Sequence, residues 1–119
     1  MSCVPDKGTL VPNWELTDLA GKKFQAHDLR QKSNLILLVA DPSASTTDLQ
    51  QWQKGVDAEL KQWLWLQAEV HIIPKPPKDL DPGAHAIDRY SRHIRHWPAG
   101  TWTVEDLQRE YVYYEARHC

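Results

Sequence analysis

The chain has 119 residues, of which 41% are hydrophobic and 25% charged, and its formal net charge is −2 at pH 7. This length predicts one domain with a modest core. The nearly balanced charge argues against a general attraction to nucleic acid or to anionic membranes. No apolar run reaches the roughly 18 residues of a membrane-spanning helix, and the first residues lack the apolar core of a signal peptide, so we expect a cytoplasmic location.

Two cysteines, Cys3 and Cys119, stand near opposite ends of the sequence. This spacing is no disulfide framework, so we expect reduced thiols. The alternatives are a bond between Cys119 and Cys3, or between Cys119 and the same residue of a second copy.

The first twelve residues predict an irregular arm, because Pro5, Gly8 and Pro12 interrupt regular structure. Residues 13–119 are expected to form the single domain.

This domain is expected to begin with a β-hairpin over residues 14–26. Trp14 and Leu16 alternate with polar residues as in a short strand, and residues 20–22 have the composition of a turn. A single helical turn is expected at residues 28–30.

Residues 35–40 form an unbroken apolar run, which is typical of a strand buried on both faces of a sheet. Pro42 ends the strand. Ser45 then has the position and the side chain of a helix cap, and Asp48 lies in the first turn, where the helix dipole favours a carboxylate. A strand end followed by a helix start is a common place for functional groups in α/β proteins.

A helix is expected over residues 46–64, because its apolar residues recur at helical spacing on one face. Residues 69–73 predict a second strand, which closes a β-α-β unit with the first. The apolar face of the helix consists of Leu49, Trp52, Val56, Leu60, Trp63 and Leu64.

Four prolines fall within residues 74–82, which favours an extended link without a helix. Residues 85–97 then predict a second β-hairpin. Thr103 has the position of a cap for a last helix over residues 103–116, with Asp106 in its first turn.

Residues 13–22 read NWELTDLAGK, and residues 43–49 read SASTTDL after the apolar run. The first segment resembles the P-x-F-x-L-x-D-x-x-G-K opening of peroxiredoxins and other thioredoxin-like redox proteins. The second resembles the peroxiredoxin active-site run Pro-Val-Cys-Thr-Thr-Glu-Leu, and the likeness continues at residues 86–90 and in the final helix. The resemblance implies an α/β, three-layer thioredoxin-like fold, shortened because the link at residues 74–82 replaces a helix.

The resemblance places Ser45 at the position of the peroxidatic cysteine and Ser43 at that of the proline two residues earlier. A cysteine reacts there because the helix N-terminus and an arginine lower its pKa, whereas a serine hydroxyl neither ionises nor cycles through a sulfenic acid. That arginine is absent as well, since Pro82 stands near its position. We therefore expect Ser45 to be a helix cap at a degenerate active site. A serine nucleophile is disfavoured, because no Gly-x-Ser-x-Gly elbow surrounds it.

The same resemblance offers a second interpretation of Pro82, as a cis proline. In thioredoxins a cis proline precedes the equivalent strand and faces the active site, and residues 81–88 are similar to that segment in spacing. Only about 5–6% of X-Pro bonds in folded proteins are cis, so composition alone favours trans. Both isomers stay open at this point.

The last residues of the chain resemble the C-P-E-C tail of one peroxiredoxin-like branch, with Ala116 at the first cysteine position. Cys119 is therefore the candidate redox thiol. Its neighbours Arg117 and His118 favour a lowered thiol pKa, whereas a helix C-terminus raises it. The alternative is an exposed cysteine without a function.

We expect no cofactor and no metal. His93 and His96 are three residues apart and therefore on opposite faces of a regular strand, which is poor ligand geometry. Arg89, Arg92 and Arg95 form a local basic patch that suits a small anion or an acidic partner, and the alternative is solvated surface charge.

The missing helix predicts a sheet face with an uncovered apolar patch, because the helices at residues 46–64 and 103–116 both belong on the other face and leave this one to the hairpin over residues 14–26. Such a face exceeds the apolar patch that soluble monomers tolerate. We expect a homodimer or a subunit of a complex through that face, with Trp65, Trp97 and Trp102 as contributors. The alternative is that these tryptophans fill the core of the domain itself.

The leading hypothesis is a noncatalytic peroxiredoxin-like domain that acts by protein binding or as an oligomer, with Ser45 at the peroxidatic position. Under this hypothesis the chain is not an enzyme. The alternative is a thiol-dependent redox protein that uses Cys119, with Cys3 or a partner's thiol resolving it.

Overall fold

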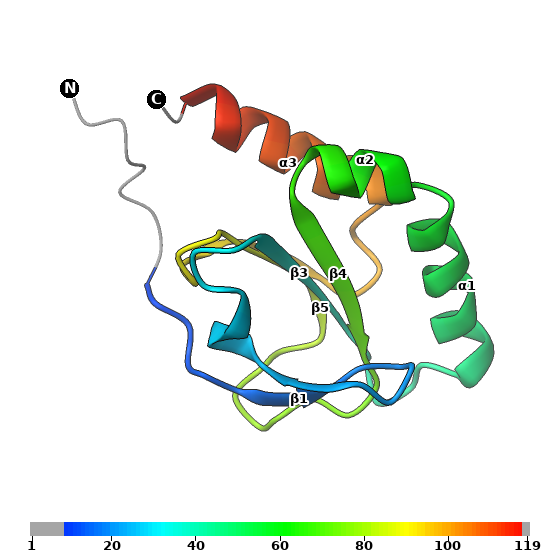
Figure 1. Cartoon of the computed structure of the whole chain (residues 1–119). Helices are drawn as coiled ribbons and strands as arrows, with labels where there is room; N and C mark the ends of the chain where they lie inside the picture. Colours follow the sequence, from blue (N-terminus) through cyan, green and yellow to red (C-terminus); the bar gives the residue numbers. More distant parts are fainter. Residues whose placement is uncertain (1–8, 118–119) are drawn as a thin grey trace.

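A computed structural model describes residues 9–117 of the chain, and within its last helix the side chains are described as far as Val112. A four-stranded sheet lies at the centre, with helices on one face and a two-stranded sheet on the other (Figure 1). The elements are β1 (Glu15–Thr17), β2 (Lys23–Gln25), the 3-10 turn η1 (Ala26–Leu29), β3 (Asn34–Val39), α1 (Thr46–Asp57), α2 (Leu60–Trp65), β4 (Ala68–Ile73), β5 (Gly83–Ile87), β6 (His93–Pro98) and α3 (Val104–Arg117).

The strands of the central sheet follow the order β4-β3-β5-β6. β3 and β4 are parallel, so α1 and α2 form the crossover of the predicted β-α-β unit. β5 is antiparallel to both β3 and β6, which confirms the predicted second hairpin. The first hairpin, β1 with β2, is confirmed as a separate two-stranded sheet.

Every residue of β3 is buried, as the apolar run predicted. The strand sends Ile36 and Leu38 to the helix side of the sheet and Leu35, Leu37 and Val39 to the other side. Two separate clusters of apolar side chains therefore pack against this one strand.

The helices cover the first face through Leu49 and Val56 of α1, Trp63 of α2, and Leu107 and Tyr111 of α3. This confirms that the helices share one face of the sheet. No helix among the described residues is long and apolar enough to cross a membrane.

The expectation that the second face lies open is wrong. Val11 of the arm, Leu16 of β1 and Leu80 of the proline-rich link are all buried against it. The indole N–H of Trp14 also donates to Asp79 Oδ1 at 2.9 Å, which joins the first hairpin to the link. The link contains no helix, as predicted, and the hairpin and the link together cover this face of the sheet.

Two of the three tryptophans expected at an interface belong to the core of the domain. Trp97 is only 6% exposed, and Trp102 packs edge-on against Trp52 with 5.3 Å between ring centroids. Trp65 is different, because 73% of its surface is exposed.

The helix expected over residues 46–64 is interrupted after Asp57. The carbonyl of Val56 accepts the indole N–H of Trp63 at 3.0 Å and the backbone N–H of Glu59 at 3.1 Å. In a continuous α-helix that carbonyl would accept the N–H of Leu60. The buried Trp63 side chain therefore satisfies the end of α1, and α2 begins in a new direction.

Trp63→Phe is expected to destabilise the domain by about 1–3 kcal/mol, because it removes a buried hydrogen bond and leaves a void at the junction of α1 and α2. Urea unfolding followed by far-UV circular dichroism measures this change. The matched control is Trp65→Phe on the exposed side of the same helix, which should stay within about 0.5 kcal/mol of the wild type. Equal effects of the two substitutions would contradict the role given to the Trp63 indole.

Candidate functional site

The segment that joins β3 to α1 is held by local hydrogen bonds. Asp41 Oδ1 accepts the backbone N–H of Ser43 at 2.8 Å and its hydroxyl at 2.6 Å. These bonds, first that of the hydroxyl, lower the pKa of the Asp41 carboxyl, since they favour its charged form. The turn fixes the direction in which the chain enters the helix.

Ser45 is the N-cap of α1, as predicted. Its hydroxyl oxygen accepts the backbone N–H of Asp48 at 3.2 Å, and Asp48 Oδ2 accepts the backbone N–H of Ser45 at 3.0 Å. This reciprocal capping box satisfies amides that the first helical turn leaves without partners. Within residues 9–117, the Ser45 side chain makes one hydrogen bond, to the backbone N–H of Asp48, and that N–H cannot activate the hydroxyl as a base would.

Pro82 is not a cis proline, because none of the described peptide bonds is cis. Its carbonyl accepts a hydrogen bond from His96 Nε2 at 2.9 Å. The next residue, Gly83, has a φ of +124°, and a Cβ there would lie 2.0 Å from the carbonyl oxygen of Trp97. The close approach of β5 and β6 therefore requires glycine at this position, which the sequence analysis did not single out.

His85, His93 and His96 lie together, contrary to the expectation that the last two point to opposite faces. The pairing of β5 with β6 shifts register between Ala86 and Ile87, so that His96 lies opposite His85 while His93 lies opposite Ile87. This β-bulge adds one residue between the two histidines and turns both to one face. A bulge leaves no periodic signal in the sequence, which is why strand alternation gave the wrong answer.

The contacts within this histidine cluster are short. His93 Nε2 lies 3.1 Å from His85 Nδ1, and the rings of His85 and His96 stack with centroids 4.3 Å apart. His85 Nε2 lies 2.7 Å from the carbonyl oxygen of Asp81. The cluster thus connects two strands to the end of the proline-rich link.

Burial lowers the pKa of His85 to about 4, because an imidazolium would lose its hydration there. Burial also lowers the pKa of His93, and the nearby His96 adds to this effect. Among the described residues, no group of three or more histidine, cysteine, aspartate and glutamate side chains is arranged to hold a metal ion. Burial thus favours the neutral forms of His85 and His93 within this hydrogen-bonded cluster.

A second histidine connects the first hairpin to the sheet. His71 of β4 has Nδ1 at 3.0 Å from Asp18 Oδ2 and Nε2 at 3.0 Å from Glu69 Oε1. Asp18 lies in the turn of the first hairpin, so this contact closes the outer edge of β4. The ring nitrogens of His71 both face carboxylates, whereas His85 Nε2 and His96 Nε2 both face backbone carbonyl oxygens.

The three arginines expected to form a patch lie in different environments. Arg92 is exposed at the turn of the second hairpin, and Arg89 is half-buried beside it. Arg95 lies on the helix side of the sheet, where Nη1 is 3.4 Å from Glu110 Oε2 and the guanidinium stacks 4.9 Å from the Trp97 ring centroid. The charge of Arg95 is therefore balanced by α3.

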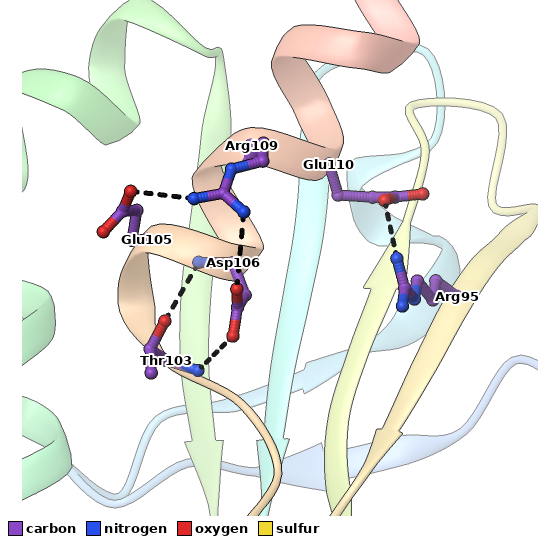
Figure 2. A network of polar contacts seen from close by, with 6 residues as sticks. All are labelled: Arg95, Thr103, Glu105, Asp106, Arg109 and Glu110. Carbon is purple, nitrogen blue, oxygen red and sulfur yellow. Dashed lines mark hydrogen bonds and ion pairs between the residues drawn. The ribbon is translucent and has the colours of Figure 1, made fainter.

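The start of α3 continues this network of charges (Figure 2). Thr103 and Asp106 form a second capping box, with the Asp106 N–H donating to Thr103 Oγ1 at 3.2 Å, which confirms the predicted cap. Arg109 lies 2.8 Å from Glu105 and 3.9 Å from Asp106. A cavity of about 290 Å³ is lined by Arg95, Trp97, Thr101, Asp106, Arg109 and Glu110, and each arginine in it already has a carboxylate partner.

Cys3 and Cys119 lie outside the described residues. The structure therefore places neither thiol relative to Ser45 or to the histidine cluster.

No protein-family model and no curated protein sequence matches this chain. Among solved structures, the chain is similar to a mitochondrial 2-Cys peroxiredoxin from Plasmodium falciparum, with a TM-score of 0.59 and 8% identity over 87% of this chain and 93% of the other. It is also similar to a protein named "Putative Thioredoxin" from Neisseria meningitidis, with a TM-score of 0.59 and 12% identity over 92% of each chain.

The chain has a thioredoxin-like fold. Identities of this size show a shared architecture and leave the chemistry to be argued from the residues themselves. In this thioredoxin-like domain, Ser45 and the histidine cluster are the features that need an explanation.

Ser45→Ala is expected to lower the free energy of unfolding by about 1 kcal/mol, because it removes the acceptor of the capping box. Ser45→Asp keeps an acceptor beside the helix N-terminus and should stay within about 0.5 kcal/mol of the wild type. Thermal or urea unfolding measures both variants. Thr47→Ala, an exposed change in the same helical turn, is the control, and a loss as large as that of Ser45→Ala would contradict the capping role.

Proposed function

We propose that this chain is a thioredoxin-fold domain that works without redox catalysis and acts by binding protein, with a second copy of itself as the partner. The observation that supports the noncatalytic role is the state of Ser45. Its hydroxyl oxygen accepts the N–H of Asp48 at the start of α1, where the peroxiredoxin resemblance places a reactive cysteine. A serine hydroxyl is not ionised at a helix N-terminus at neutral pH, so this position stabilises the helix and supplies no thiolate.

The test of the noncatalytic role is reductase-coupled turnover of hydrogen peroxide and of a small disulfide, with Cys119→Ser beside the wild type. We expect no turnover above the buffer rate in either protein. Turnover that Cys119→Ser abolishes would overturn the proposal and move the chemistry to the last residue of the chain. Turnover that survives the substitution would place the chemistry at another group and overturn the proposal equally.

The support for binding comes from α2. Leu60, Leu64 and Trp65 of this short helix are 60%, 68% and 73% exposed, and the two leucines lie one turn apart on the same side of it. A contiguous exposed patch of large apolar side chains marks an interaction site more often than exposed apolar side chains scattered over the surface do. We therefore assign the interface to this stripe of Leu60, Leu64 and Trp65. The helix-free face of the sheet, which the sequence predicted as the interface, is buried within the domain.

The spacing of the stripe suits a second copy. Leu60 and Leu64 are one helical turn apart, so in an antiparallel pair of helices related by a two-fold axis, Leu60 of one copy faces Leu64 of the other. Three side chains per copy make an interface smaller than the roughly 800 Å² per partner of stable complexes. We therefore expect a weak, concentration-dependent dimer.

Sedimentation velocity between about 20 and 500 µM tests this dimer, in the range where small interfaces associate. The weight-average mass should rise with concentration in the wild type, and Leu64→Glu should weaken association at least about tenfold, because it buries a carboxylate against the partner's leucine. Leu10→Glu, at an exposed leucine of the arm, is the matched control. A monomer throughout this range, or equal effects of the two substitutions, would contradict the second copy as partner.

A further inference from the structure

We propose that the cluster of His85, His93 and His96 is a proton-sensitive latch, which holds the edge of the sheet closed while the three rings are neutral and opens it in acid. The observation behind this proposal is the β-bulge that brings the three rings together on one face of β5 and β6. The latch goes beyond the proposed binding function and does not depend on it.

The contacts of the cluster determine where each proton sits. A carbonyl oxygen only accepts, so His85 Nε2 donates to Asp81 O and His96 Nε2 donates to Pro82 O. His85 Nδ1 is then an acceptor, and His93 Nε2 donates to it across 3.1 Å. With each ring uncharged and its proton on Nε2, all of these hydrogen bonds are made at once.

Added protons break this pattern. A proton on His85 Nδ1 turns that nitrogen into a donor that faces the N–H of His93, so His93 has to shift its own proton to Nδ1 or move away. A second proton on the cluster places two charged rings in contact, with those of His85 and His96 stacked at 4.3 Å. The closed geometry therefore accepts fewer protons than three exposed histidines do.

His93 connects the cluster to the edge of the sheet. Its backbone N–H donates to Thr9 O at 3.0 Å, and the N–H of Val11 donates to Ser91 O at 2.8 Å. These bonds attach the arm to β6, and the buried side chain of Val11 covers the helix-free face. Movement of His93 therefore loosens the arm and exposes this face of the core.

The charged groups around the cluster do not cancel the effect of burial on the histidine rings. On the β5 side the residue His85 is 5% exposed, and the titratable groups that act on its ring are Asp81 of the link and His93 and His96 of β6. The carboxylate of Asp81 favours the charged ring, but its influence is smaller than that of burial. For His93, burial and His96 act in the same direction. The neutral forms of His85 and His93 thus stabilise the closed edge above the ordinary histidine pKa of about 6.5, and this stability is lost as pH falls through that value toward the lowered pKa of His85.

Hydrogen exchange of single amides, followed by NMR at about pH 7.5 and pH 5 and corrected for intrinsic rates, tests the latch. The amides of His93 and Val11 report on the latched edge. The amide of Leu19, which donates to Ile72 O at 2.8 Å on the opposite edge, is the control. A histidine with a pKa near 6.5 when open and about 4 when closed makes opening roughly 30-fold more frequent at pH 5, so we expect protection of the His93 and Val11 amides to fall at least about tenfold more than that of Leu19.

His85→Gln keeps a side-chain N–H donor toward the Asp81 carbonyl and removes the ring on which the expected pH dependence rests, so its loss of protection between the two pH values should be less than half that of the wild type on a logarithmic scale. His96→Gln gives a second variant of the same kind, and His71→Gln at the opposite edge is the control that leaves the cluster intact. Protection that is unchanged between the two pH values would overturn the latch. So would an equal loss at Leu19, which indicates global unfolding, or a wild-type response in both cluster variants.

Discussion

The apolar side chains of β3 alternate between the two faces of the sheet, and all of them are buried. The rest of this short chain therefore has to form two covering layers, one for each face. The first consists of three amphipathic helices. The second consists of the first hairpin, the arm and the proline-rich link. Each of these segments is too small to form a core alone, and each is ordered because β3 offers it an apolar surface.

The two covers differ in how their polar backbone groups are satisfied. The helices bond their own carbonyls and amides and need help only at their ends, which Ser45, Thr103 and the Trp63 indole provide. The second cover has little regular structure, so it depends on tertiary contacts such as Trp14 with Asp79, and His85 with the Asp81 carbonyl.

The parts of the fold that depend on neighbouring residues were predictable from the sequence. The capping role of Ser45 follows from a serine three residues before an aspartate, and the burial of β3 follows from its apolar run. The break after Asp57 was not predictable, because an indole seven residues further along the chain satisfies the Val56 carbonyl. The histidine cluster was missed because one bulged residue reverses the alternation on which the prediction depended, and the cover of the second face was missed because irregular segments carry no period.

The four prolines between residues 74 and 82 bear on how this second cover is ordered at all. A chain loses conformational entropy when it folds, and a segment without helix or strand recovers little of that loss through its own hydrogen bonds. Proline restricts the unfolded chain beforehand, so less freedom remains to be lost when the link settles on the sheet. The nine-residue link can therefore cover the sheet at a lower entropic cost than a flexible loop of the same length, which would need many more contacts to stay in place.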